Sequence, residues 1–241
     1  MPYHLSSFIS ARLSPGLQSQ LSQLPGFPAS LTHCLLAGPE RSGKTSILFH
    51  FAYTLAAAGK QVGFLCKRSK LEQVPPLLPL GANAQDAAWQ NINLRYLDTA
   101  ADLQKYAACI HLSPNPPQAL IVDDLSEFIV ARPGERAHDQ EIVKTLAFLH
   151  EAARCASPGQ AEPCLLLVSD LSGAEGPRAL YLYQRWLPLI IHIRPAEGGL
   201  VLGLLPQVAE LHAVPVKCMA QLHFCLAGQS ALSLEYMTFP S

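Results

Sequence analysis

The sequence predicts an α/β domain with a mainly parallel central sheet, helices on both faces and an antiparallel extension at its C-terminal end. Two observations support this fold class. Up to about residue 186, short apolar runs alternate with segments of helical periodicity, which is typical of parallel strands buried on both faces. Beyond that point, strand-like runs follow one another without helices between them, which indicates antiparallel pairing.

The composition indicates a globular chain with a sizeable core. Of the 241 residues, 49% are apolar and 15% are charged, which excludes a disordered chain. The formal net charge of −1 excludes a basic field over the whole molecule, so any contact with nucleic acid is expected to be local. The seven cysteines form no CxxC pair, and no apolar run approaches the ~20 residues of a membrane span. We therefore expect neither a zinc knuckle nor a membrane partner.

The predicted elements follow the order expected for βαβ units. Residues 1–30 are predicted to be a polar lead-in with a short helix near Pro15, and residues 31–241 to be the main domain. Strands are predicted at 31–37, 61–66, 91–97, 119–125 and 164–170. Helices are predicted from Ser46 to a glycine cap at Gly59, from an N-cap at Thr99, and over 139–155. The proline-rich residues 71–90 are expected to be irregular.

A glycine-rich segment lies between the first predicted strand and the first predicted helix. It reads Gly38, Pro39, Glu40, Arg41, Ser42, Gly43, Lys44, Thr45 and Ser46. This matches the GxxxxGK[ST] pattern of a P-loop, whose backbone N–H groups and helix N-terminus bind phosphate oxygens. Lys44 is predicted to reach the β- and γ-phosphates, and the Thr45 hydroxyl to bind Mg²⁺. The segment therefore predicts ATP and Mg²⁺ as ligands.

An acidic pair ends the apolar run of the fourth predicted strand. Asp123 directly follows ALIV, and Asp124 comes next. A carboxylate at this place in a P-loop protein holds Mg²⁺ through water, and Asp123 is our candidate. Asp123 and Lys44 are therefore the predicted catalytic residues. The alternative interpretation is a strand end capped by solvated acids.

The group that would orient the attacking water is less evident. The second predicted strand ends in Cys66-Lys67-Arg68 and carries no acid. Glu72 and Glu127 are the candidates nearest in sequence, and each can equally be a surface residue. From the residues alone, the identity of this group stays open.

The order of these motifs resembles the ATPase core of RecA-type recombinases and their eukaryotic paralogues. The resemblance covers about residues 31–240 and rests on GPERSGKTS, LIVDD, EIVKTLAFLHEAAR, CLLLVSD and QRWLPLIIHI, in that order. Within that group, the chain is most similar to the SWIM-domain-associated ATPases of the Shu complex, through LIVDDLSEFI and LYQRWLPLIIHIRP. The resemblance implies a RecA-like P-loop fold in which CLLLVSD lies between the strand before the P-loop and the LIVDD strand.

The resemblance also bears on catalysis. RecA-type recombinases carry a catalytic glutamate where this chain has Cys66-Lys67-Arg68, and a phosphate-sensing glutamine where it has Ser169 and Asp170. Slow ATP hydrolysis and weak coupling to DNA are therefore expected.

The resemblance further implies partners. The expected partners are a SWIM-domain zinc protein, a recombinase or its paralogues, and single-stranded DNA, in a nuclear complex for homologous recombination and DNA repair. Three arginines in glycine-containing loops are candidate DNA contacts: Arg132, Arg136 and Arg178. Phe8 and Ala11 form a Phe-x-x-Ala pattern, which recombinases use to dock onto a neighbouring ATPase by strand addition.

Two other functions fit parts of the sequence. A P-loop kinase for a small molecule would need an arginine-rich lid, and Arg178, Arg185 and Arg194 are present without a pair of lid-like helices. A non-catalytic scaffold would keep the P-loop fold for assembly alone. Loss of the Lys44 ammonium would separate the scaffold from the ATPase, since a scaffold would still assemble.

Overall fold

The computed structural model describes residues 8, 15–22, 27–79, 82–83, 85–130, 136–157, 162–172, 180–205, 220–227 and 231–239. Within them the strands are β1 (His33–Gly38), β2 (Val62–Cys66), β3 (Leu78–Pro79), β4 (Ile92–Tyr96), β5 (Ala119–Val122), β6 (Leu165–Leu171), β7 (Leu189–Ala196), β8 (Gly199–Leu204), β9 (Gln221–Ala227) and β10 (Ala231–Thr238). The helices are α1 (Pro15–Ser22), α2 (Lys44–Ala57), α3 (Arg68–Gln73), α4 (Ala100–Cys109), α5 (Arg136–Ala156) and α6 (Leu180–Gln184).

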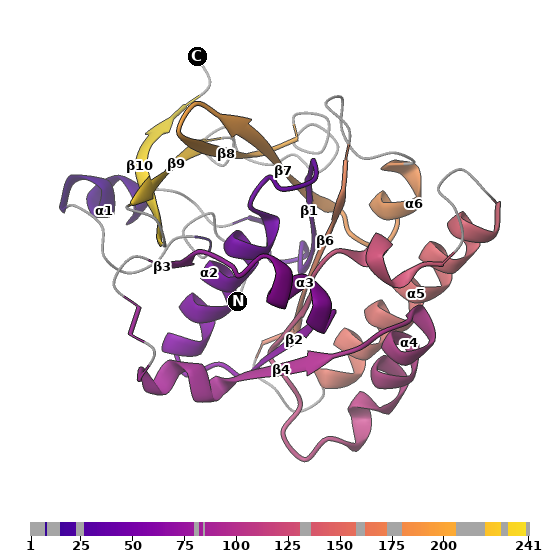
Figure 1. Ribbon diagram of the computed structural model, residues 1–241. Coiled ribbons are helices and arrows are strands. Elements are labelled where there is room, and N and C mark those ends of the chain that lie inside the picture. Colours follow the sequence, from indigo (N-terminus) through magenta and orange to yellow (C-terminus); the bar gives the residue numbers. More distant parts are fainter. Residues whose placement is uncertain are drawn as a thin grey trace.

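One ten-stranded sheet runs through this part of the chain, in the order β3-β10-β9-β8-β7-β1-β6-β5-β2-β4. Strands β7, β1, β6, β5, β2 and β4 are parallel to one another, and β8 and β9 extend the sheet by antiparallel pairing. Helix α2 lies on one side of the sheet, and α4 and α5 lie on the other (Figure 1). The predicted α/β class with a mainly parallel sheet is therefore confirmed, as is the place of β6 between β1 and β5.

The direction of β7 differs from our expectation. We placed the antiparallel extension after about residue 186, but β7 pairs with β1 in parallel, Leu35 lying opposite Ile190. The antiparallel part begins at β8, which follows a two-residue turn at Glu197 and Gly198. The segment that contains α6 connects β6 to β7 and returns the chain, so β7 runs parallel to β1. The turn at Glu197 and Gly198 then reverses the chain, so β8 is antiparallel to β7.

The sheet is covered on both faces, so consecutive strand residues are buried. Leu35 and Leu36 in β1, and Leu166 and Leu167 in β6, have no exposed surface. Helix α5 places one apolar stripe against β6, at Ile142, Leu146, Leu149 and Ala153. Burial of this kind supplies the main favourable free energy of folding. No helix among the described residues has the length and apolar character that crossing a bilayer would need.

Local capping explains where two helices begin and end. Gly59 has a φ of +78° after α2, and two backbone bonds close a Schellman motif, from Gly59 N to Ala56 O at 3.0 Å and from Lys60 N to Leu55 O at 3.0 Å. Helix α4 begins with a capping box between Thr99 and Asp102. Both ends lie where the sequence predicted them.

The predicted irregular stretch 71–90 is wrong in part. It contains the C-terminal half of α3, the two-residue strand β3, and a 3₁₀ helix at Ala87–Asn91. Helix α3 has no buried residues, so it lacks the apolar periodicity that would have indicated it.

Replacement of Gly199 is expected to destabilise the fold. A Cβ atom at this position would lie 1.8 Å from the Phe224 carbonyl oxygen, so β8 and β9 would have to separate locally. We expect Gly199→Ala to lower the free energy of unfolding by about 3 kcal/mol. Gly16→Ala is the control, because a Cβ at Gly16 would meet nothing within 4 Å. Urea denaturation of both variants measures the difference, and equal midpoints would contradict the expectation.

Candidate nucleotide-binding site

The P-loop joins the end of β1 to the start of α2. Helix α2 begins at Lys44, and its N-cap, Gly43, has a φ of +86°. Arg41 also has a positive φ, of 57°. The positive φ favours glycine at position 43, and a Cβ there would lie 2.7 Å from Leu200 Cδ2, so the Leu200 side chain would also have to shift. This arrangement directs backbone N–H groups and the N-terminus of a 14-residue helix toward one place, which is how such loops bind phosphate.

The Lys44 side chain lies over the loop itself. Its Nζ donates to the Gly38 carbonyl oxygen at 3.1 Å and to the Pro39 carbonyl oxygen at 2.9 Å. Burial lowers the pKa of Lys44, and the nearby carboxylates of Asp124 and Asp123 oppose that shift. The ammonium is therefore held at the loop, close to the acids that end β5.

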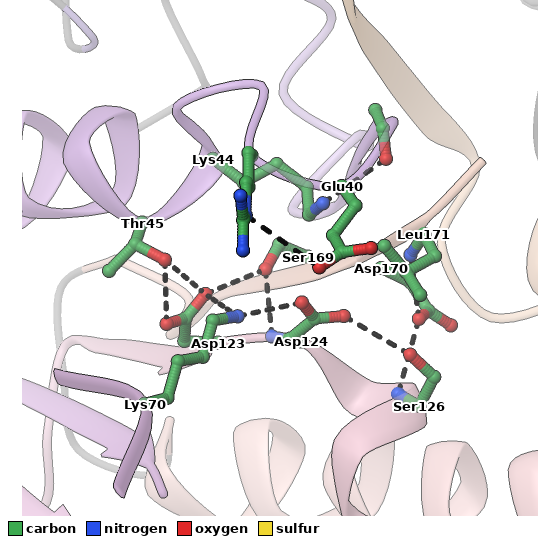
Figure 2. Close-up of polar contacts among 12 residues, drawn as sticks. Glu40, Lys44, Thr45, Lys70, Asp123, Asp124, Ser126, Ser169, Asp170 and Leu171 are labelled. Atoms are coloured by element: carbon green, nitrogen blue, oxygen red, sulfur yellow. Dashed lines mark hydrogen bonds and ion pairs between the residues drawn. The ribbon is translucent and has the colours of Figure 1, made fainter. Parts of the chain in front are cut away.

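Asp123 is joined to the loop through Thr45. Thr45 Oγ1 donates to Asp123 Oδ2 at 2.9 Å and lies 3.2 Å from Oδ1, while Ser169 Oγ donates to Oδ1 at 3.1 Å. Asp123 is fully buried, and this burial raises its pKa while Lys70 acts in the opposite direction. Figure 2 shows Lys44, Thr45 and Asp123 around one site. The two predicted catalytic residues, Lys44 and Asp123, thus lie in the same region of the molecule.

The register of the parallel strands produces this juxtaposition. Val122 in β5 lies opposite Val168 in β6, and Ser169 lies opposite Leu36 in β1. The carboxyl ends of the three strands are therefore level, and the residues that follow them converge at one edge of the sheet. Ligands of open α/β sheets bind at this edge.

The donor set fits Mg²⁺ bound together with a nucleotide. A hydroxyl and a carboxylate supply hard oxygen ligands, and Mg²⁺ commonly takes one or two carboxylates together with phosphates and water. No group of three or more His, Cys, Asp or Glu side chains within the described part of the chain is arranged to hold a metal ion. Thr45 and Asp123 are thus the residues that would hold Mg²⁺, whose chemistry would be to neutralise charge on the phosphates.

A second buried acid, Asp170, lies next to this pair at the end of β6. Its carboxylate accepts from the backbone N of Ser126 at 3.1 Å, from its neighbour Leu171 N at 2.8 Å, and from the Tyr183 hydroxyl. Ser126 Oγ in turn donates to Asp124 Oδ1 at 3.1 Å. Burial raises the pKa of Asp170, and the Tyr183 hydrogen bond acts against this rise. The sequence analysis placed Asp170 at the end of the predicted strand 164–170 but did not identify Tyr183 as its partner.

Lys70 is the cation that the sequence analysis missed. It lies on α3, and its Nζ is 2.7 Å from Asp124 Oδ2 and 3.3 Å from Asp123 Oδ1. Burial lowers the pKa of Lys70, but the carboxylates of Asp123 and Asp124 outweigh this effect and raise the pKa above its usual value. A lysine four residues past the end of β2 was the available signal, because the carboxyl end of β2 points to the same edge of the sheet as β5.

The two candidate water-orienting acids lie elsewhere on the surface. Glu72 is exposed and pairs with Arg68 at 3.7 Å on α3, and Glu127 is exposed in a 3₁₀ helix, Leu125–Phe128. At the end of β2, Cys66 is buried, and burial raises its pKa to about 12. Neither glutamate has a described contact with Thr45 or Asp123, whereas Cys66 is close enough to Asp123 for that carboxylate to add to the rise in its pKa.

The remaining predicted residues are distributed as follows. Arg136 is the exposed first residue of α5. Phe8 is buried in the core of its own chain, with its ring centroid 4.9 Å from that of Phe51 in α2. Docking through Phe8 would therefore require it to leave this contact. Arg132, Arg178 and Ala11 lie outside the described residues.

Comparison with known proteins shows which sequences and folds this chain resembles. No protein-family model matches the chain. A solved structure of the RadB recombinase matches with a TM-score of 0.60 and 17% identity, covering 91% of this chain and 96% of RadB. In sequence, the chain is 27% identical to the human ATPase SWSAP1 over 179 residues, which is 71% of this chain and 76% of SWSAP1. The chain is therefore similar in sequence to the ATPase SWSAP1, and its fold matches that of the RadB recombinase.

The mouse relative agrees with the human one. The chain is 29% identical to the mouse ATPase SWSAP1 over 175 residues, covering 69% of this chain. The match spans 60% of the mouse protein, so the activities of that whole protein are not assigned to this chain. The RadB likeness shows the fold of the chain, and the SWSAP1 matches show which proteins it resembles in sequence.

Removal of the Tyr183 hydroxyl is expected to destabilise the protein in a pH-dependent way. Asp170 has a raised pKa in the folded state, so stability falls as pH rises above its ordinary value of 3.8. Tyr183→Phe removes a donor to the ionised carboxylate and raises this pKa further. We expect a loss of about 1–3 kcal/mol near pH 7, and a smaller loss near about pH 4, where the carboxyl is protonated.

Urea denaturation of Tyr183→Phe and the unmodified protein at both pH values measures this effect. Tyr181→Phe is the matched control, because the Tyr181 side chain is exposed on the same helix. A loss that is the same at both pH values would contradict the role assigned to Tyr183.

Proposed function

We propose that this chain binds Mg·ATP in its P-loop and hydrolyses it slowly. The observation that carries the proposal is the meeting of Lys44 and Thr45, from the loop, with Asp123 from β5. Lys44 would neutralise phosphate charge, and Thr45 and Asp123 would hold Mg²⁺. Slow turnover is proposed because α3 brings the cation of Lys70 to this site, and no described acid beyond the strand ends contacts Thr45 or Asp123.

We further propose that the chain is a subunit of a nuclear complex for homologous recombination and DNA repair. Its similarity to the ATPase SWSAP1 supports a Shu-type assembly, with a SWIM-domain zinc protein and a recombinase or its paralogues as partners. Single-stranded DNA is the proposed nucleic acid, contacted locally, since the formal net charge is −1. The supporting observations are the sequence relationship and the fold.

A second candidate function is a non-catalytic scaffold, and one feature of the site supports it. Lys70 forms ion pairs with Asp123 and Asp124, so a side chain of the protein itself supplies counter-charge to these acids, as a scaffold could use. A scaffold would tolerate loss of ATP binding, whereas an ATPase subunit would not. Assembly measured in a variant that no longer binds ATP therefore separates the scaffold from the ATPase subunit.

Lys44→Ala is expected to weaken binding of a fluorescent ATP analogue by about 10- to 100-fold, because charge-assisted hydrogen bonds to phosphate are lost. Lys105→Ala is the control, because Lys105 is an exposed residue of α4. Fluorescence titration in Mg²⁺ gives the affinities. Unchanged affinity in Lys44→Ala would overturn the nucleotide site, and assembly that survives the loss of binding would favour the scaffold.

Arg136→Ala is expected to reduce the dependence of single-stranded DNA binding on salt. An arginine that neutralises one phosphate contributes about 0.7 to the slope of log K against log salt concentration. Titrations of an oligonucleotide at several salt concentrations, with the assembled complex, measure the slope. Arg185→Ala serves as a control arginine, since its guanidinium lies over the Trp186 ring at 5.6 Å. An unchanged slope would remove Arg136 from the proposed contacts.

A further inference from the structure

The Lys70 ammonium occupies the acidic edge of the nucleotide site. Its Nζ lies 2.7 Å from Asp124 Oδ2 and 3.3 Å from Asp123 Oδ1 (Figure 2). The Lys70 side chain is 21% exposed, while those of Asp123 and Asp124 are 0% and 6% exposed. The pair is therefore largely removed from water, where an ion pair is screened far less than at the surface.

The other charged groups near these acids are already engaged. Lys44 Nζ is bound to the carbonyl oxygens of Gly38 and Pro39. Asp170 accepts from two backbone N–H groups and from the Tyr183 hydroxyl. Among the described residues, Lys70 is thus the cation in direct contact with Asp123 and Asp124. A buried carboxylate needs such a partner, because leaving it unpaired is costly.

The same carboxylate is the one that would hold Mg²⁺. Asp123 accepts from Thr45, the other residue that would hold the metal, and from Lys70 at the same oxygen, Oδ1, that receives Ser169. Because Mg²⁺ and an ammonium are both cations that seek carboxylate oxygens, they repel each other at one site. Binding of the metal must therefore oppose the presence of Lys70.

We propose that Lys70 is a resident cation of the nucleotide site, which partly replaces Mg²⁺ as the counter-charge and competes with it for Asp123. This inference rests on the proposed nucleotide binding. It assigns to Lys70 a positioning and charge-compensating role. The chain then binds ATP with a weaker requirement for Mg²⁺ than a site of the same fold without this lysine.

A purely structural ion pair would behave differently. Its loss would lower stability and would weaken ATP binding to a similar extent with and without Mg²⁺. A resident cation predicts opposite changes in the two conditions. Without Mg²⁺, removal of Lys70 leaves two carboxylates facing the phosphates, so ATP binding weakens. With ATP present, removal of Lys70 frees Asp123, so Mg²⁺ binds more tightly.

The test measures binding of a fluorescent ATP analogue to the full chain, in excess EDTA and across a Mg²⁺ titration. For Lys70→Met we expect about tenfold weaker binding in EDTA, and half-saturation at about tenfold lower Mg²⁺ concentration. Lys67→Met is the matched control, because it removes a lysine just after β2 that faces an aromatic ring instead of the acids. The Lys67 Nζ lies 6.0 Å from the centroid of the Phe128 ring. Lys70→Arg keeps the charge and is expected to retain the Mg²⁺ dependence of the unmodified protein.

Three results overturn the inference: a Lys70→Met protein with unchanged Mg²⁺ dependence, equal weakening in both conditions, or the same change in Lys67→Met. If Lys70→Met does not fold, Lys70→Gln removes the charge while its amide can still donate to the acids, and the same two directions apply. Failure of the unmodified protein to bind ATP in either condition would refute the proposed function itself. The two failures are therefore distinguishable.

Discussion

The hydrogen bond from Thr45 to Asp123 is the contact on which the arrangement of the site depends. It joins residues that are 78 positions apart in sequence, at 2.9 Å, and it does so across the carboxyl edge of the sheet. Because β5, β6 and β1 lie side by side in register, the loop after β1 and the acids after β5 share one space. If β5 slipped by one residue, the side chain after Val122 would point to the opposite face of the sheet, and the pair would be lost.

Much of this geometry could be predicted from local signals. The P-loop is recognised by the spacing of its glycines between a predicted strand and a predicted helix. Asp123 is recognised by its place directly after an apolar run. The capping box at Thr99 and the glycine cap at Gly59 are likewise short-range patterns, and each involves residues within a few positions of one another. Such signals require no knowledge of the tertiary structure.

What the sequence did not reveal depends on long-range packing. The parallel direction of β7 is set by its pairing with β1, about 155 residues away, and an apolar run has the same periodicity in either direction. Lys70 lies on a six-residue helix with no buried residue, so it produced no apolar pattern. Its contact with Asp124, and that of Tyr183 with Asp170, exist because separate elements end at the same edge of the sheet.

The burial of Phe8 ties the start of the chain to the helix that carries the P-loop threonine. Its ring packs on Phe51, which lies two turns beyond Lys44 on α2. Recombinant versions of the protein that begin after Phe8 would therefore leave an unfilled hydrophobic hollow beside that helix. Any study of its nucleotide chemistry should therefore retain Phe8, whose ring supports the helix that carries Lys44 and Thr45.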